Sequence, residues 1–527
     1  MTNNDILICE AFHRLLSTPS AELKQKLGAQ IPLNIANYIA ELPPEETLDP
    51  SVMATRISEF CERPENEALD DWFLDIYNSL GEDDIKKLVK KTGDPGDGAD
   101  ENLEIIITNE GRDISVSLAW RSLEILKNEG TNEPPTSNLI LKQENFLNSL
   151  KLVVINIGDG NWENGFSASA RILNNGHPLP YDVPGKLPPQ PELPELYKQW
   201  WEAYDNFILG KGIFSKGLTA APNQQTNFST EEVKKELKER AAKISESLNN
   251  WLKSEAFSPI QNKIRTEFLR DEELRIILQT SNVVMRRLPW HLWNLFKDYS
   301  QAEIAFSPPE SDKKTPKISG AKTRILVVLG QAKKESNGGI NLEPDKQIIE
   351  SLTDAETVFL TEPTREELNK ALWQEPGWQI LCFSGHSSSN WDDSKGWIQI
   401  NPKEALNLEE LKYALTAAID RGLQLAIFNS CNGMGLATQL ADLHLPQIIV
   451  MRERVPDLVA QEFVKNFFEL FAKQGKSLYL SVRQAREKLQ SMEDKFPCAT
   501  WLPVICQNSA TLPLNWQELK GGNRRMT

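Results

Sequence analysis

The sequence predicts an α/β domain with a mostly parallel sheet, preceded by an α+β region and an N-terminal all-α bundle. Two observations indicate the α/β domain. Apolar strands alternate with amphipathic helices from residue 324 onward, and strands such as "RILVVLG" and "QILCFSG" are apolar almost throughout. Continuous apolar strands are typical of parallel sheets that are covered on both faces. At 527 residues the chain is long enough for several domains.

Short amphipathic segments, separated by caps and prolines, fill residues 5–91 and predict a compact helical bundle over residues 1–92. The next stretch, "TGDPGDGADE", is rich in Gly, Pro and Asp, so we expect residues 93–101 to form a linker. Its aspartates lack the D-x-D-x-D-G order of a calcium-binding loop. We therefore expect no calcium site here, and we expect no metal or cofactor elsewhere in the chain.

Residues 102–310 are expected to form the α+β region. It would hold a hairpin at "LEIIITNEGRDISVSL", a strand at "LVVINIG", two long helices around "WWEAYDNFI" and "EEVKKELKERAAKISESLNNWL", and a strand at "LRIILQ". A polar, proline-bearing stretch over residues 307–322 predicts the last boundary. The α/β domain would then occupy residues 315–515, and the tail, residues 516–527, would be disordered.

Within the α/β domain the pattern predicts each element in turn. We expect strands at 324–330, 356–360, 378–385, 396–400, 423–431 and 447–451, and helices at 343–352, 365–372, 408–422, 435–443, 460–474 and 477–492.

The overall composition limits the classes of function. With 58 Lys and Arg against 74 Asp and Glu, the net charge of -16 argues against nucleic acid as the main partner and favours a protein or peptide. No apolar run is long enough to cross a membrane, and the first residues lack the positive region of a secretory signal, so we expect a cytoplasmic protein. The six cysteines lack C-x-x-C spacing, which predicts free thiols.

His386 and Cys431 each follow an apolar strand, one crossover unit apart. The ends of neighbouring parallel strands meet at one edge of a sheet, where catalytic groups gather. His386 would take the proton of Cys431 as a general base, or stabilise the thiolate as an imidazolium. Backbone amides at Ser387 and Cys431 would form an oxyanion hole. Either residue alone is more often a turn or a small core residue, so the pair carries the prediction.

Two other chemistries fit the sequence poorly. The "GKS" at residues 475–477 lacks the earlier glycine of a phosphate-binding loop and follows a helix, and no strand ends in the G-x-S-x-G of a serine hydrolase. Cys382, Cys498 and Cys506 are expected to be structural.

Several segments resemble the CHAT family of caspase-like bacterial proteases, relatives of caspases and separase: "CFSGHSSS", "GWIQI", "LAIFNSCNG", "VMRERVPDLVAQEF" and "SLYLSVRQAREKLQ". The upstream "LPWHLW" is similar to the Leu-Pro-Trp element that often precedes that protease core. The resemblance covers residues 152–514. It implies a caspase-like α/β sandwich and a cysteine endopeptidase, with His386 and Cys431 at the positions of the catalytic dyad. Ser387 departs from the family pattern, since many caspase-like enzymes have Gly after the histidine.

The resemblance also implies partners. The helical bundle of residues 1–92 is similar to the death-fold-like, effector-associated domains of bacterial conflict systems. It would bind an activating protein in a defence or regulated-death pathway, and the protease would cleave a protein effector. The alternative is an inactive pseudoprotease that serves as a scaffold for protein interaction, which Ser387 favours.

Charged residues after the strand at 447–451 are candidates for substrate selection. Of these, Glu453 and Asp457 are the candidate pocket residues. An acidic lining would favour Arg or Lys before the scissile bond, whereas a basic lining, from Arg452 and Arg454, would favour Asp or Glu. Asp457 stands at a predicted helix start and is equally well explained as an N-cap.

Overall fold

The computed structural model describes residues 3–16, 18, 26–27, 30–40, 50–63, 66–80, 151–174, 177–178, 181–210, 230–307, 322–330, 342–390, 392–509, 511 and 514–519. The chain divides into two compact units, residues 1–152 with 172–181, and residues 153–171 with 182–527. The predicted linker at 93–101 and the predicted hairpin at 103–118 lie outside the described residues.

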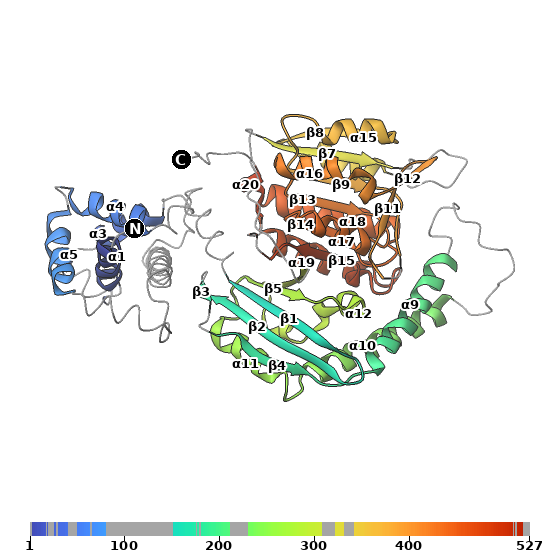
Figure 1. The fold of residues 1–527 in the computed structure, drawn as a ribbon, viewed down its shortest axis with the longest axis horizontal. Helices are drawn as coiled ribbons and strands as arrows, with labels where there is room; N and C mark the ends of the chain where they lie inside the picture. Colours follow the sequence, from blue (N-terminus) through green and yellow to red (C-terminus); the bar gives the residue numbers. More distant parts are fainter. Residues whose placement is uncertain are drawn as a thin grey trace. The chain divides into compact units, whose positions relative to one another are not determined.

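The described part of the N-terminal region is helical, as predicted (Figure 1). Its helices are α1 (Asn3–Leu16), α3 (Gln30–Ala40), α4 (Pro50–Cys61) and α5 (Glu67–Ser79). Their apolar side chains share one hydrophobic cluster. Within it, the rings of Phe12 and Phe73 meet edge to face at 5.9 Å, and those of Tyr38 and Phe60 lie 4.8 Å apart. These helices therefore have a hydrophobic core of their own.

A large sheet is formed by strands between residues 152 and 507 (Figure 1). The described residues give it 12 strands, in the order β3-β2-β1-β5-β6-β15-β14-β13-β9-β7-β8, with β4 paired to β2. The strands are β1 (Leu152–Asn161), β2 (Gly165–Asn174), β3 (His177–Pro178), β4 (Val183–Leu187), β5 (Leu274–Gln279), β6 (Ala302–Ser307), β7 (Thr323–Leu329), β8 (Ala355–Thr361), β9 (Ile380–Ser384), β13 (Leu425–Asn429), β14 (Gln447–Met451) and β15 (Pro503–Gln507).

The C-terminal part of the sheet is mostly parallel, which confirms the predicted fold class. Strands β8, β7, β9, β13 and β14 run parallel to their neighbours, and only β15 is antiparallel to β14 in this part. Every residue of β7, β9, β13 and β14 is buried, and the middle residues of these strands are apolar on both faces.

Helices flank the sheet, and a second, three-stranded sheet lies beside it. The small sheet consists of β10 (Ser387–Ser389), β11 (Gly396–Asn401) and β12 (Glu404–Asn407). The helices are α9 (Glu192–Gly210), α10 (Thr230–Leu252), α11 (Ser258–Glu267), α12 (Val283–Arg287), α13 (Leu295–Asp298), α14 (Glu343–Glu350), α15 (Arg365–Leu372), α16 (Lys412–Asp420), α17 (Met434–Asp442), α18 (Asp457–Phe468), α19 (Leu478–Lys488) and α20 (Trp516–Leu519). Short helical turns cover Trp290–Leu292, Leu408–Leu411, Glu469–Lys473, Leu489–Met492 and Ala499–Trp501.

Two features differ from the sequence prediction. The expected boundary at 307–322 does not interrupt the sheet, because β6 pairs with β15 and joins β5 to the C-terminal strands. The expected disordered tail begins with the helix α20, in which Trp516 is buried and meets the ring of Phe471 at 5.8 Å. Among the described helices, none has both the length and the apolar character needed to span a bilayer.

Candidate active site

His386 and Cys431 occupy equivalent places at the ends of two neighbouring strands. Strands β9 and β13 are parallel, and their last paired residues are Ser384 and Asn429. His386 and Cys431 each stand two positions beyond this pair. The sheet therefore brings the two predicted residues to the same edge, as the crossover argument required.

Serine hydroxyls join the segment after His386 to the loop that holds Cys431. The Ser387 hydroxyl hydrogen-bonds to the Ser430 hydroxyl at 2.7 Å and to the carbonyl of Cys431. The Ser389 hydroxyl donates to the carbonyl of Asn432 and accepts from the N–H of Gly435 at 2.9 Å. These contacts give a structural role to Ser387 and Ser389, two of the three serines that follow His386.

The residues after Cys431 suit a tight turn. Asn432 has a φ of +48°, a left-handed conformation that asparagine tolerates better than most residues. At Gly433 a Cβ atom would lie 2.7 Å from the side chain of Val450, so only glycine fits without a shift. The "SCNG" sequence therefore sets the course of the chain just after the thiol.

Both members of the pair are uncharged in this conformation at neutral pH. Cys431 is only 9% exposed, and its thiol donates to the carbonyl of Val455 at 3.8 Å. Burial raises the pKa of Cys431 to about 11. Burial also lowers the pKa of the half-buried His386, so its imidazole is neutral and able to accept a proton.

A pocket with two carboxylates adjoins Cys431. It encloses about 320 Å³ of space that is partly open to solvent, and its lining comprises Leu342, Asp345, Gly385, Asn429, Ser430, Cys431, Val455, Asp457, Ala460 and Gln461. Sequence reasoning missed Asp345. It lies in the first turn of α14, far along the chain from Cys431, and nothing in its local sequence distinguishes it from an ordinary helix-start carboxylate.

Asp345 is 2% exposed, and its Oδ2 accepts a hydrogen bond from the Asn429 side chain at 3.0 Å. Its Oδ1 has no hydrogen-bond partner among the described residues. Burial raises the pKa of the Asp345 carboxyl, and the hydrogen bonds from Ser384 and Asn429 oppose that shift.

The structure separates the two candidate pocket residues. Asp457 lines the pocket, and because Pro456 is the N-cap of α18, the alternative role of Asp457 as an N-cap is not observed. Glu453 is 1% exposed and does not line the pocket. Its carboxylate accepts hydrogen bonds from Tyr197 and Trp201 of α9 at 2.7 and 2.9 Å. Among the described residues, no group of three or more His, Cys, Asp or Glu side chains is arranged to hold a metal ion.

The family model of the CHAT domain matches residues 246–516, slightly more than half of the chain. The chain belongs to the CHAT domain family. The matched residues run from within α10 to the start of α20 and include both His386 and Cys431.

Solved structures of a distant protein also align with the chain. Two crystal structures of the separase–securin complex of Saccharomyces cerevisiae match with 11% and 10% sequence identity, each with a TM-score of 0.44. In each case the alignment covers 97% of this chain and 40% of the matched chain, so this protein spans less than half the length of the chains that it matches. No curated protein matches the chain.

Proposed function

We propose that the CHAT domain is a caspase-like cysteine endopeptidase in which Cys431 is the nucleophile and His386 the general base. The observation that carries the proposal is the matched position of the two residues, each two places beyond the register pair of Ser384 and Asn429, beside a pocket. Membership of the CHAT family supports the same class of reaction.

The reaction follows from these groups. His386 takes the thiol proton as the sulfur of Cys431 attacks the scissile carbonyl, and the backbone amides of Ser387 and Cys431 hold the oxyanion. The imidazolium then gives its proton to the departing amine, which leaves a thioester on Cys431. A water molecule, deprotonated by His386, hydrolyses the thioester and releases the new carboxylate. The hydrogen bond from the Cys431 thiol to the carbonyl of Val455 must break before this sequence starts.

The pocket carboxylates support a substrate with Arg or Lys before the scissile bond. Asp345 and Asp457 place two acidic groups beside Cys431, and no basic side chain is part of the lining. Ionisation of a buried carboxylate that lacks a partner for one oxygen is costly, and a cation bound in the pocket would offset that cost. The guanidinium of an arginine side chain would offer both the charge and the hydrogen-bond donors.

The N-terminal helical unit is proposed as the site of an activating protein partner, in a cytoplasmic defence or regulated-death pathway of a bacterium. A hydrophobic core of its own suits a recruitment module. The substrate of the protease would then be a protein effector.

A pseudoprotease scaffold is the second candidate function. It is favoured by the burial of Cys431, by the hydrogen bond of its thiol to Val455 and by its raised pKa of about 11. Covalent labelling by a thiol-directed peptide electrophile with Arg or Lys at the reacting end separates the two functions. In a protease, Cys431 is labelled, and replacement of His386 slows the labelling. In a scaffold, the labelling rate of Cys431 is the same with and without His386.

A further inference from the structure

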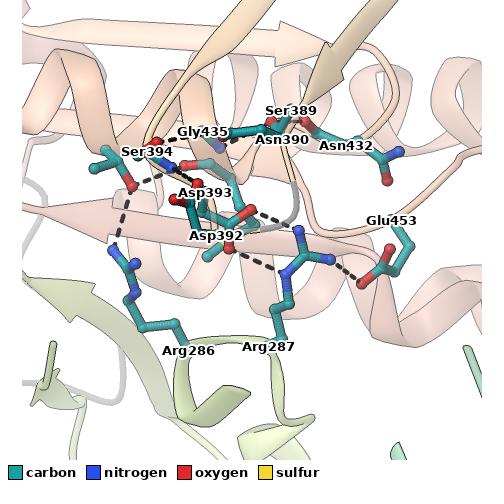
Figure 2. A network of polar contacts seen from close by, with 12 residues as sticks. Arg286, Arg287, Ser389, Asn390, Asp392, Asp393, Ser394, Asn432, Gly435 and Glu453 are labelled. Carbon is teal, nitrogen blue, oxygen red and sulfur yellow. Dashed lines mark hydrogen bonds and ion pairs between the residues drawn. The ribbon is translucent and has the colours of Figure 1, made fainter. Parts of the chain in front are cut away.

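Arg287 is the last residue of α12, between β5 and the Leu-Pro-Trp segment, and it belongs to neither of the loops that carry the proposed dyad. Its side chain is 8% exposed. The guanidinium makes three polar contacts with two buried carboxylates. Its Nε and Nη2 donate to the two oxygens of Asp393, at 3.0 and 2.5 Å, and its Nη1 donates to Glu453 Oε1 at 2.8 Å. Figure 2 shows Arg287 between the two carboxylates.

Asp393 belongs to the segment that begins at His386. The backbone carbonyl of His386 accepts from the N–H of Gln399 in β11, so His386 stands at the base of the β10–β11 hairpin. Asp393 lies in the turn of that hairpin and is fully buried, and its N–H donates to the carbonyl of Asn390 at 3.1 Å. The position of Asp393 is therefore coupled to that of His386 through the short β10–β11 hairpin.

Glu453 belongs to the segment that supports Cys431. Its backbone carbonyl accepts at 3.2 Å from the N–H of Asn432, the residue after Cys431. Two positions further on, Val455 accepts the thiol hydrogen. The Glu453 carboxylate also accepts hydrogen bonds from Tyr197 and Trp201 of α9.

The neighbouring arginines anchor the same helix. Arg286 donates to the Thr438 hydroxyl of α17 at 3.2 Å, and α17 begins just after the Cys431 turn. Arg452, beside Glu453, donates to the backbone carbonyl of Arg287 at 2.9 Å. Helix α12 is thus fixed against both segments at once, and one guanidinium binds a buried carboxylate on each of them.

We infer that Arg287 is a positioning residue that sets the separation of His386 and Cys431. It binds Asp393 in the β10–β11 hairpin, which follows His386, and Glu453 in the segment that hydrogen-bonds to the turn after Cys431. The inference rests on the proposed dyad. A planar guanidinium has the donors to satisfy two carboxylates in different directions, whereas the ammonium of lysine is a point charge on a flexible stem. Lysine at this position would keep the charge and lose the fixed geometry.

The test follows the pH dependence of iodoacetamide alkylation at Cys431 in the full chain, with the modified residue located by peptide mapping. If His386 removes the thiol proton, the wild-type rate rises as the imidazole loses its own proton and then levels off. In His386→Ala the rate should climb only as the thiol itself ionises. Arg287→Lys should give the profile of His386→Ala and reduce kcat for peptide hydrolysis by about 10²-fold with little change in KM.

Arg486 provides a matched control. Its Nη2 contacts Glu303 at 2.6 Å in another buried Arg–Glu pair, which joins α19 to β6, two elements that carry neither His386 nor Cys431. Arg486→Lys should cost stability and leave the alkylation profile unchanged. If it changes the profile as Arg287→Lys does, the effect is general loosening and the inference is wrong.

Two further outcomes are decisive. An Arg287→Lys protein that keeps the wild-type profile overturns the positioning role and leaves the dyad standing. A His386→Ala protein with the wild-type profile overturns the dyad, and the positioning role with it. Should Arg287→Lys fail to fold, Asp393→Asn keeps the side-chain shape while weakening the link to the hairpin, and it should shift the profile in the same direction; an unchanged profile then overturns the inference.

Discussion

Asp345 and Asn429 form a hydrogen bond of 3.0 Å that joins the start of α14 to the last residue of β13, two positions before Cys431. It places a buried carboxylate with one unpartnered oxygen in the wall of the pocket beside the thiol. The predictions on substrate selection depend on this contact.

Asp345→Asn should weaken the hydrolysis of peptides with Arg before the scissile bond more than that of peptides with a neutral residue there. Loss of one buried charge–charge contact to the substrate is expected to reduce kcat/KM for the Arg peptide by about 10- to 100-fold. Matched peptides that differ at this one residue provide the measurement. Equal losses on both peptides would show that Asp345 does not select the substrate.

Asp345 also predicts a pH dependence of stability. Because burial raises its pKa, the folded protein binds a proton more tightly at this group than the unfolded chain does. Its ionisation therefore costs stability as pH rises, from the ordinary pKa of an aspartate through the raised one. Asp345→Asn should be more stable than wild type at neutral pH, and this advantage should disappear below the ordinary pKa. Thermal unfolding across this range measures it, and an advantage that grew toward acidic pH would contradict the raised pKa.

Ser387→Gly restores the residue that many caspase-like enzymes have after the histidine. It removes the hydroxyl contacts to Ser430 and Cys431 and keeps the backbone N–H. Since loss of one oxyanion-hole donor costs about 10²- to 10³-fold, a smaller change, below about 10-fold in kcat, is expected when only the hydroxyl is removed. A loss in the larger range would mean that the hydroxyl itself takes part in the reaction.

The positions of the strands, and of His386 and Cys431 beyond the ends of two of them, were predictable because they follow from local patterns. The elements at 365–372 and 447–451 appear with the predicted bounds, as α15 and β14. Each has a local cause: a capping box at Thr364 and Glu367 starts α15, and β14 is apolar after its first residue, Gln447. His386 and Cys431 follow from the ends of two such strands.

The features that sequence reasoning missed depend on contacts between distant segments. Asp345 and Arg287 look like ordinary helix residues, and only the folded sheet brings them to Cys431 and Glu453. Strand β15 contains Pro503 and follows a helical turn, so its apolar run gave no clear signal. Glu453 was predicted as a pocket residue because it adjoins β14. Its hydrogen-bond donors, Tyr197 and Trp201 of α9, are distant in the sequence, so its neighbours in the sequence did not indicate them.

Cys382→Ala separates a structural cysteine from Cys431, the proposed nucleophile. Cys382 is buried within β9 and two residues before the end of that strand. Its replacement should leave peptide hydrolysis nearly unchanged and destabilise the fold by about 1 kcal/mol through a small cavity. Denaturant unfolding and a peptidase assay on the same sample measure both effects. Abolished hydrolysis in a stable Cys382→Ala protein would contradict the assignment of Cys431 as the nucleophile.

Removal of residues 1–92 tests the recruitment role of the N-terminal helices. Because these helices share a hydrophobic cluster of their own, the remaining chain should fold and hydrolyse a generic peptide at an unchanged or higher rate. Size-exclusion chromatography and thermal unfolding check the fold. An insoluble or molten product would show that the helices belong to the core of the protease.

The most direct test of the central claim is covalent labelling of Cys431 by an Arg-containing peptide with a thiol-directed electrophile, compared in wild type, Cys431→Ala and His386→Ala. The account predicts an adduct at Cys431 in wild type, none in Cys431→Ala, and labelling slower by about 10²-fold or more in His386→Ala, with all three proteins folded. The account would be contradicted if Cys431→Ala were labelled as fully as wild type, or if wild type and His386→Ala were labelled at equal rates.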